Sequence, residues 1–456
     1  MALSFLDRER TIAPRSYNRW LIPPAALAVH LCIGEVYAFS VFKTPLVDHF
    51  DTKLTPISII FSIAIVMLGL SAAVFGTWVE RVGPRKAMFT SGVCWSLGFV
   101  VAALGVASDQ LWLVYLGYGV LGGIGLGIGY ISPVSTLIKW FPDRPGLATG
   151  LAIMGFGGGA LIAGPLSESL LSAYSSNPAD AIVPAFLTLA AIYFVAMMLG
   201  AFTVRVPADD WLPEGFEPEK AIADDPMKTS GDVTAKTSIK TPQFWLLWTI
   251  LFCNVTAGIG ILEQAAPMIQ DFFSDVNAAE AAGYVGLLSL ANMAGRFVWS
   301  STSDVIGRKP TYFGYLGIGA ILYFVLASSG TSSLALFVAV TAVILSFYGG
   351  GFATIPAYLK DMFGGIEVGA IHGRLLTAWA AAGVAGPLII NVIADSQEEA
   401  GKQGAALYEL SLYIMVGVLI VGFVANLLVR PVGKQYHLRR RRRRRGVQTA
   451  KAGGNR

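Results

Sequence analysis

Twelve long apolar stretches recur along the chain and restrict its fold more than any other feature. A helix needs roughly 20 mostly apolar residues to cross the hydrocarbon core of a bilayer. Of the 456 residues, 54% are hydrophobic and 14% are charged, which is too apolar for a water-soluble protein of several ordinary domains. We predict membrane-spanning helices over residues 20–45, 55–78, 87–107, 111–138, 147–171, 183–204, 243–270, 281–302, 311–328, 332–359, 373–394 and 406–429.

The apolar stretches indicate helices and not strands. They show no alternation of polar and apolar residues, and they are longer than the roughly ten residues that a membrane-barrel strand needs. The first stretch also exceeds the apolar core of a signal peptide, about 7 to 15 residues, so we expect it to be retained. The predicted fold class is therefore an all-α membrane protein.

Basic residues are distributed unevenly between the two sides of these helices. Lys and Arg are retained on the cytoplasmic side during membrane insertion. With the N-terminus inside, the outer loops hold only Lys43, Lys53 and Lys402. Every other basic residue except Arg296 falls inside, including the seven consecutive arginines at 439–445. We predict a multi-pass protein of a bacterial inner membrane with both termini in the cytoplasm.

The second six helices repeat the first six at an offset of 222 to 224 residues. Residues 80–86 (ERVGPRK) are matched by 304–309 (DVIGRK), and residues 163–166 (AGPL) by 385–388 (AGPL). Two such halves place a binding site near the bilayer midplane, at their interface, and can rock around it. We expect an N-terminus (1–19), an N-terminal half (20–204), a cytoplasmic linker (205–241), a C-terminal half (242–430) and a basic tail (431–456).

The repeated loop combines an acid at a helix end, a glycine turn and several cations. Such groups can hold neighbouring helices together at the cytoplasmic face and release them when the halves rock. The alternative is that the cations only anchor the loops on the cytoplasmic side. The acids are Glu80 and Asp304, and the cations are Arg81, Arg85, Arg308 and Lys309.

Arg296 lies well inside the eighth predicted helix, where a permanent charge is costly unless it faces a cavity or a partner. Its fork of donors suits bidentate recognition of a carboxylate. The alternative is a structural ion pair with a buried acid such as Glu35, and the two roles can alternate. Glu35 is the only carboxylate near the middle of a span, and low-dielectric surroundings favour its neutral form. We expect Glu35 to carry a proton.

Aromatic and amide side chains complete the candidate binding site, although each of them can instead pack against helices or face lipid. They are Tyr37, Tyr130, Asn292, Tyr348 and Trp379. The four scattered histidines, the lack of a Ser/His/Asp order and the lack of metal-ligand spacing argue against an enzyme. We expect no cofactor, no metal and no nucleic-acid partner, since no nucleic-acid module accompanies the arginine run.

Several motifs resemble known transporters. Residues 76–86 (GTWVERVGPRK) resemble the loop signature of the major facilitator superfamily, and residues 300–309 are its weaker copy. Residues 130–159, with their Lys-Trp-Phe-Pro-Asp-Arg loop, resemble the oxalate/formate antiporter family, which is related to the monocarboxylate transporters. Residues 348–356 and 292–296 also match that family. The resemblance implies twelve helices, a small carboxylate substrate, and Arg296 at the position of the family's substrate-binding arginine.

The resemblance also implies a difference in substrate. In the oxalate exchanger a lysine on helix eleven provides a second cation, and Trp379 replaces it here. One midplane cation offsets one carboxylate, and a second anionic charge would be left unpaired. We therefore expect a secondary carrier for a monocarboxylate such as formate, lactate or pyruvate, working as a monomer by proton symport or anion exchange.

Other functions stay open at this point. One alternative within transport is an oxalate/formate-type dicarboxylate antiporter. Another is a generic exporter of a drug-like cation, which a single midplane arginine disfavours. An alternative of a different class is a sensor or scaffold that does not transport and whose basic tail binds anionic lipids or an acidic protein.

Overall fold

The computed structural model describes residues 4–223 and 225–438, and most of them lie in helices. An isolated backbone bridge joins Ile12 to Val206. Seven consecutive arginines, and most of the predicted basic tail, lie beyond residue 438 and outside the described residues. The all-α prediction agrees with this architecture.

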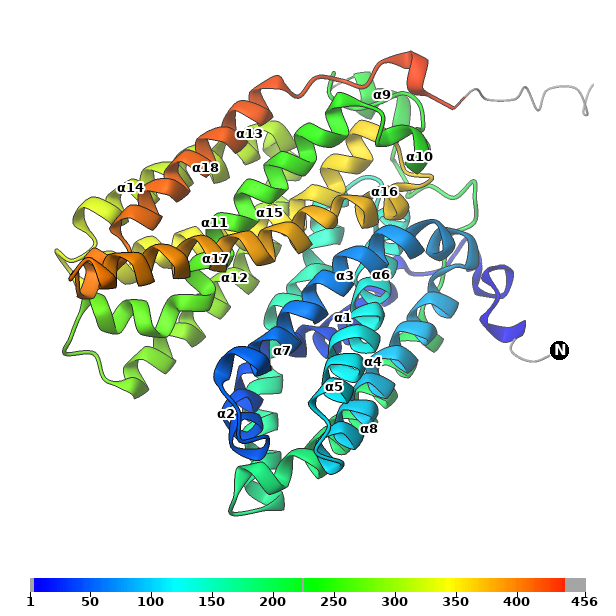
Figure 1. The fold of residues 1–456 in the computed structure, drawn as a ribbon. Helices are drawn as coiled ribbons and strands as arrows, with labels where there is room; N and C mark the ends of the chain where they lie inside the picture. The colour runs from blue at the N-terminus through cyan, green and yellow to red at the C-terminus, as the bar shows by residue number, and fades with distance from the viewer. Residues whose placement is uncertain (1–3, 224, 439–456) are drawn as a thin grey trace, which may run out of the picture.

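The N-terminal half contains six helical columns (Figure 1). The first column is interrupted: α1 is followed by a short 3-10 segment, η4, and then by α2. The fourth column passes through a π-helical segment, η5. The columns are α1 (Ile22–Ile33) with η4 (Gly34–Ala38) and α2 (Ser40–His49); α3 (Leu54–Val82); α4 (Pro84–Ala107); α5 (Leu111–Val114) with η5 (Tyr115–Gly122) and α6 (Gly123–Trp140); α7 (Pro145–Tyr174); and α8 (Pro178–Thr203).

The C-terminal half repeats this order, and two short helices, α9 (Pro218–Ala223) and α10 (Ala235–Ser238), lie in the linker between the halves. Its fifth column is divided at Leu376. The six columns are α11 (Pro242–Phe272); α12 (Ala278–Ile306); α13 (Arg308–Phe313) with η6 (Gly314–Ile318) and α14 (Gly319–Ser329); α15 (Leu334–Phe363); α16 (Val368–Leu375) with α17 (Thr377–Glu399); and α18 (Glu409–Leu428).

Eleven of the columns in the described residues are long and apolar enough to cross a membrane. The exception is α12, which is 29 residues long but interrupts its apolar sequence with polar residues, Asn292 and Arg296 among them. Its length matches the other columns, so α12 completes the twelve. The one column that is not apolar enough by this criterion is therefore the one that carries the buried arginine.

Glycine ends two equivalent helices in the two halves. Gly83 follows α3 with φ 84°, and Gly307 follows α12 with φ 89°. A residue with a Cβ atom rarely adopts this left-handed backbone conformation, whereas glycine adopts it freely. A proline or a cation comes next and starts a new helix at once. The repeated sequence thus makes the same tight reversal in each half.

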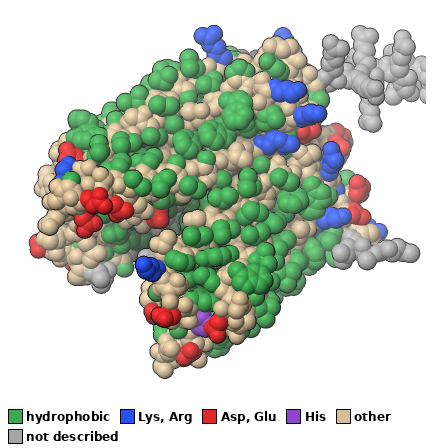
Figure 2. All heavy atoms as spheres, in the orientation of Figure 1, with side chains coloured by type: hydrophobic (Ala, Val, Ile, Leu, Met, Phe, Trp, Pro, Cys, Tyr) green, Lys and Arg blue, Asp and Glu red, His purple; other side chains and the backbone are tan. Residues whose placement is uncertain are grey.

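The two halves meet at one end of the bundle and diverge at the other (Figure 1). The end at which they meet carries the N-terminal segment, the linker and the end of α18, and we call it the termini face. Helix α12 packs on α7, and α16 and α17 pack on α3. Figure 2 shows hydrophobic side chains over the middle of the visible surface and a hollow between the halves, away from the termini face. This conformation is therefore closed at the termini face and open at the opposite face.

Candidate functional site

The side chain of Arg296 is fully buried where α12 meets α7. Its Nε donates a hydrogen bond to the Asn292 side-chain oxygen at 3.1 Å, one helical turn earlier. Its Nη1 donates to the carbonyl oxygen of Ile153 in α7 at 3.3 Å. The remaining nitrogen, Nη2, has no hydrogen-bond partner among the described residues. A buried guanidinium with an unused donor can accept an anionic ligand.

The Arg296 guanidinium is held by packing as well as by hydrogen bonds. It lies 5.8 Å from the ring centre of Phe156 and 5.3 Å from that of Phe352. Gly157 provides the space for it, since a Cβ atom there would be 2.7 Å from Nε. Cation-π contacts of this kind offset part of the cost of burying the charge. Helices from both halves thus fix the orientation of the guanidinium.

Aromatic side chains from five helical columns surround the guanidinium. Trp379 in α17 lies against Tyr130 in α6, with ring centres 5.3 Å apart, and against Phe352 in α15 at 4.6 Å. Tyr37 of η4 packs edge-on against Phe156 at 5.2 Å. The Tyr130 hydroxyl and the Trp379 indole nitrogen are buried and have no hydrogen-bond partner in the part of the chain that is described. We call these six residues, with Arg296 among them, the central cluster.

Most of the side chains predicted for the site do lie at this place. Tyr348 joins it from α15: its hydroxyl oxygen is 3.5 Å from that of Tyr37, across the interface of the halves. Asn292 orients Arg296 through its amide oxygen. Sequence reasoning missed Phe156 and Phe352, which look like ordinary core residues in the sequence. The glycines beside them, Gly157 and Gly351, gave the only hint of a close approach.

Glu35 lies apart from the central cluster. It is fully buried in η4, and its Oε2 accepts a hydrogen bond from the Tyr118 hydroxyl at 2.9 Å. Tyr118 belongs to η5 and packs against Trp95 in the interior of the N-terminal half. In this conformation Glu35 and Arg296 form no ion pair within the described residues. The guanidinium is therefore not neutralised by the acid that the sequence suggested.

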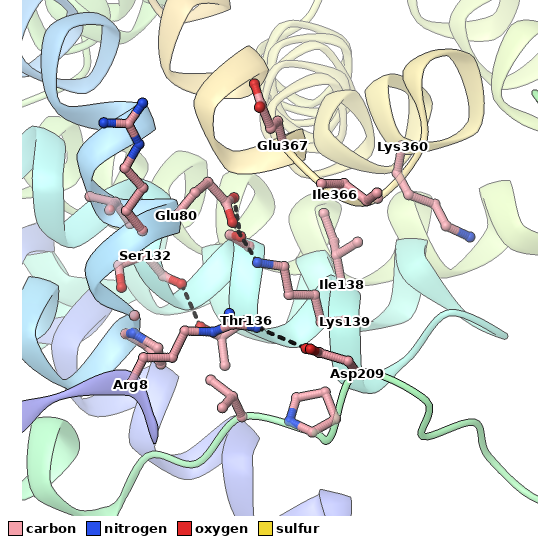
Figure 3. A pocket seen from close by; sticks show the side chains of 18 of the residues that line it. Arg8, Glu80, Ser132, Thr136, Ile138, Lys139, Asp209, Lys360, Ile366 and Glu367 are labelled. Atoms are coloured by element: carbon pink, nitrogen blue, oxygen red, sulfur yellow. Dashed lines mark hydrogen bonds and ion pairs between the residues drawn. The ribbon is translucent and has the colours of Figure 1, made fainter. Parts of the chain in front are cut away.

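At the termini face, the Glu80 carboxylate joins the halves. One oxygen accepts hydrogen bonds from the Ser135 hydroxyl at 2.6 Å and from the backbone N–H of Gly369, in the first turn of α16, at 2.9 Å. The other oxygen pairs with Lys139 of α6 (Figure 3). A carboxylate is stabilised at a helix N-terminus by unpaired N–H groups and by the helix dipole. We call Glu80, Ser135, Lys139 and Gly369 the first acid cluster.

The symmetry-related place in the other half is built the same way. Asp304 accepts hydrogen bonds from the backbone N–H groups of Gly146, at 2.9 Å, and Leu147, at 2.8 Å, in the first turn of α7. Arg308 pairs with Asp304 at 2.6 Å and with Asp361 of α15 at 3.0 Å. We call these five residues the second acid cluster. In both clusters an acid at the end of one half binds the first turn of a helix in the other half.

The remaining predicted cations do not contact these acids. Arg85 donates to the carbonyl oxygens of Phe5 and Phe202, and Lys309 donates to those of Leu427 and Val429. Arg81 is exposed. Arg85 and Lys309 thus tie the termini and helix ends of their own half. Sequence reasoning missed Lys139 and Asp361, because nothing in the sequence indicates which residue of a neighbouring helix faces an acid.

A cavity of about 810 Å³ lies between the two halves beside the first acid cluster (Figure 3). Its lining includes Glu80 and Lys139 from the first half, and Lys360 and Glu367 from the second. Among residues 4–223 and 225–438, no group of three His, Cys, Asp or Glu side chains could hold a metal ion. The charged groups at this face pair with one another or with backbone groups, as Lys139 does with Glu80 and Lys360 does with the carbonyl oxygen of Pro142.

Comparison with known proteins agrees with this architecture. The chain is 26% identical over 370 residues to the oxalate:formate antiporter of Oxalobacter formigenes, covering 81% of this chain and 83% of that protein. It is 26% identical to apicoplast pyruvate carrier 1 of Toxoplasma gondii, covering 64% of this chain and 61% of the carrier. The solved structure of the proton:xylose symporter XylE superposes with a TM-score of 0.70 at 16% identity, covering 90% and 94% of the two chains.

These similar proteins are transporters and not enzymes. A family model described as Major Facilitator Superfamily matches residues 25–387 and 265–453. The two matches together span most of the chain, including both acid clusters and the central cluster. The chain is therefore a multi-pass membrane protein that belongs to the major facilitator superfamily.

Proposed function

We propose that this protein carries a small monocarboxylate, such as formate, lactate or pyruvate, by alternating access, with Arg296 binding the carboxylate. The observation that carries the proposal is the unused Nη2 of a fully buried arginine at the interface of the halves. Two further unused donors, the Tyr130 hydroxyl and the Trp379 indole N–H, lie in the same cluster. All three groups can donate a hydrogen bond, which suits an anion.

The charge of the central cluster supports one carboxylate over two. Arg296 is its only permanent cation, and the family resemblance implies that Trp379 stands where the oxalate exchanger carries a lysine. A dicarboxylate would leave one negative charge unpaired in a low-dielectric site, which is costly. Oxalate/formate-type antiport remains the rival, favoured only by the identity shared with the oxalate:formate antiporter.

The two acid clusters act in this proposal as the gate at the cytoplasmic face. Each binds a helix N-terminus of the opposite half, so both must release when the halves rock to open that face. Glu80 and Asp304 make these contacts directly, and Lys139 and Arg308 pair with these acids from within the same half. Arg85 and Lys309 serve in our proposal as anchors within each half, whereas the exposed Arg81 has neither role.

The proposal includes a location and partners. We place the protein in a bacterial inner membrane as a monomer with both termini in the cytoplasm, so that the termini face is cytoplasmic. A proton moving with the anion, or a second anion moving against it, keeps the cycle electrically neutral. The arginines at 439–445 would attract anionic lipids with about 1 kcal/mol each near the surface.

Uptake into proteoliposomes tests the proposal. We expect Arg296→Ala to lose transport of radiolabelled lactate by at least about 100-fold, because a buried charged hydrogen bond to the substrate is worth roughly 3 kcal/mol. Arg430→Ala is the matched control, since Arg430 is exposed at the end of α18. Wild-type uptake by Arg296→Ala would refute the anion site, and oxalate uptake that exceeds lactate uptake would favour the antiporter.

A further inference from the structure

His30 of α1 is fully buried, and both of its ring nitrogens face backbone carbonyl oxygens. Nδ1 lies 2.7 Å from the carbonyl oxygen of Ala152 in α7. Nε2 lies 3.1 Å from the carbonyl oxygen of Tyr130 in α6. Carbonyl oxygens only accept hydrogen bonds, so each contact is favourable only when the ring nitrogen carries a proton.

This pair of acceptors suits the doubly protonated ring. A neutral imidazole has one N–H group and can satisfy only one of the two carbonyl oxygens. Its other nitrogen then points a lone pair at the second oxygen. An imidazolium donates to both. The surroundings of His30 therefore offer a prepared place for one additional proton.

Aromatic, charged and titratable groups from several helices surround His30. The Tyr130 ring of α6 stacks on the imidazole, with ring centres 5.3 Å apart, and the Phe156 ring of α7 lies at 6.5 Å. Across the interface, Arg296 of α12 and His372 of α16 are the other charged or titratable groups nearby. Helices α8 and α4 also pack on α1, but none of their titratable side chains contacts His30 in the described residues. Glu35 lies further along the same column and is bonded to Tyr118.

His30 and Arg296 are linked through consecutive residues of α7. The carbonyl oxygen of Ala152 faces His30, and the carbonyl oxygen of the next residue, Ile153, accepts from Arg296. The positive charge of Arg296 opposes a second positive charge on His30. A carboxylate bound to Arg296 would cancel that opposition, so anion binding and protonation would favour each other.

We propose that His30 is the proton site of the transport cycle, protonated when a carboxylate occupies Arg296; this rests on the anion-carrier function proposed above. The proton comes from water on the outer side and leaves to the cytoplasm after the anion. One proton and one monocarboxylate cross together, so no net charge moves. Because linkage is reciprocal, the bound proton tightens anion binding by the same factor by which the anion favours the proton.

Glu35 is the alternative proton site, and the structure places it less well. Its single recorded hydrogen bond is to Tyr118, inside the N-terminal half, and no group in the central cluster bonds to it. A proton on Glu35 therefore has no direct connection to the occupancy of Arg296. His30 has one through α7 and another through the Tyr130 ring.

The test compares net accumulation with exchange in proteoliposomes. An inward proton gradient should drive lactate accumulation in the wild type. In His30→Gln this accumulation should fall by about 10-fold or more, a value in the range typical of coupling between two binding sites. Exchange of external for internal lactate needs no net proton movement, so His30→Gln should retain it, which also shows that the variant folds. Glu35→Gln and His372→Gln are the matched controls and should accumulate lactate as the wild type does.

A second measurement observes the protonation of histidine itself. Nitrogen NMR of labelled histidine should show one imidazolium appearing when lactate is added near neutral pH, and the signal should be missing in His30→Gln. Gradient-driven accumulation by His30→Gln at the wild-type level would overturn the proposal. Loss of gradient-driven accumulation in Glu35→Gln would also overturn it. A wild-type protein that exchanges anions but never accumulates lactate would overturn it as well. In each of these cases Arg296→Ala would still report separately on the anion site.

Discussion

The two acid clusters repeat between the halves, whereas the central cluster does not. Glu80 binds the N–H of Gly369 and Asp304 binds that of Gly146, with matching positions 223 or 224 residues apart. The same offset takes Arg296 to Ala72, a fully buried apolar residue. Gene duplication therefore accounts for the contacts that close one face, while the substrate chemistry belongs to residues that the duplication does not pair.

The two acid clusters also differ in how their charges are balanced. Glu80 pairs with Lys139 alone, and the lysine side chain is 29% exposed. Asp304 shares Arg308 with Asp361, and all three side chains are largely buried. The second acid cluster is thus the one with more ion pairs. A comparison of variants in the two clusters can show whether connectivity or symmetry decides how tightly the face is closed.

Among changes that leave Arg296 in place, the largest effect should come from filling the space beneath its guanidinium. In Gly157→Ala the added Cβ atom would lie 2.7 Å from Arg296 Nε, so the side chain must leave its place between Phe156 and Phe352. We expect lactate transport to fall by about 10-fold or more, as overpacking a buried site costs roughly 1–3 kcal/mol. Gly164→Ala, on the same helix with open space around it, should transport normally.

If Gly157→Ala transported at the wild-type rate, the asymmetric site would lose its main geometric support. Uptake kinetics with purified protein would decide this. Equal protein amounts in the liposome membrane would be confirmed by quantitative immunoblot for both variants.

A smaller effect should separate the acid clusters. Both Glu80→Gln and Asp304→Asn should shift the resting protein toward opening at the termini face, because each removes a charge from a helix N-terminus, worth about 0.3–1 kcal/mol or more when partly buried. We expect Glu80→Gln to shift the protein further toward this opening than Asp304→Asn does. Lys139 loses its carboxylate partner in Glu80→Gln, whereas Arg308 still pairs with Asp361 in Asp304→Asn. Reactivity of a cysteine introduced at Ser132, which lines the cavity beside Glu80, would report the opening.

A larger shift in Asp304→Asn would contradict this expectation. It would mean that the number of carboxylates left to the paired cation does not decide how tightly the face is closed. Arg81→Ala is the control for charge change alone, because Arg81 is exposed and belongs to the same loop. Its cysteine reactivity should equal that of the parent protein.

A more local effect should come from removing one donor while retaining the ring. Trp379→Phe retains the packing against Tyr130 and Phe352 but lacks the indole N–H. We expect the KM for lactate to rise by about 10-fold, because one hydrogen bond to a charged carboxylate is worth roughly 1.5–3 kcal/mol. Trp245→Phe, on the exposed side of α11, is the matched control. An unchanged KM would mean that Trp379 only packs.

Much of this arrangement could be predicted from the sequence, for physical reasons that differ by region. Long apolar runs identify helices because the bilayer demands them. A charge in such a run identifies Arg296, because its burial is costly unless it has a role. The loop repeats gave Glu80 and Asp304. The helix N-termini that bind these acids can be identified only once the packing of the two halves is known.

Partners chosen by tertiary packing could not be predicted. Lys139, Asp361 and Phe156 carry no sequence signal that separates them from similar residues nearby. Glu35 was linked to Arg296 because both are buried charges, yet η4 directs it to Tyr118. His30 was dismissed as one of four scattered histidines, and only the two carbonyl oxygens beside its ring single it out.

The central claim is that one buried guanidinium binds one carboxylate in an otherwise symmetric frame. Thermal unfolding of the purified protein with small mono- and dicarboxylates tests this most directly, because a ligand at 100 times its Kd stabilises the native state by about 2.7 kcal/mol. We predict stabilisation of the wild type by a monocarboxylate, weaker stabilisation by oxalate, and no stabilisation of Arg296→Ala. Equal stabilisation of the wild type and Arg296→Ala by the same carboxylate would contradict the account.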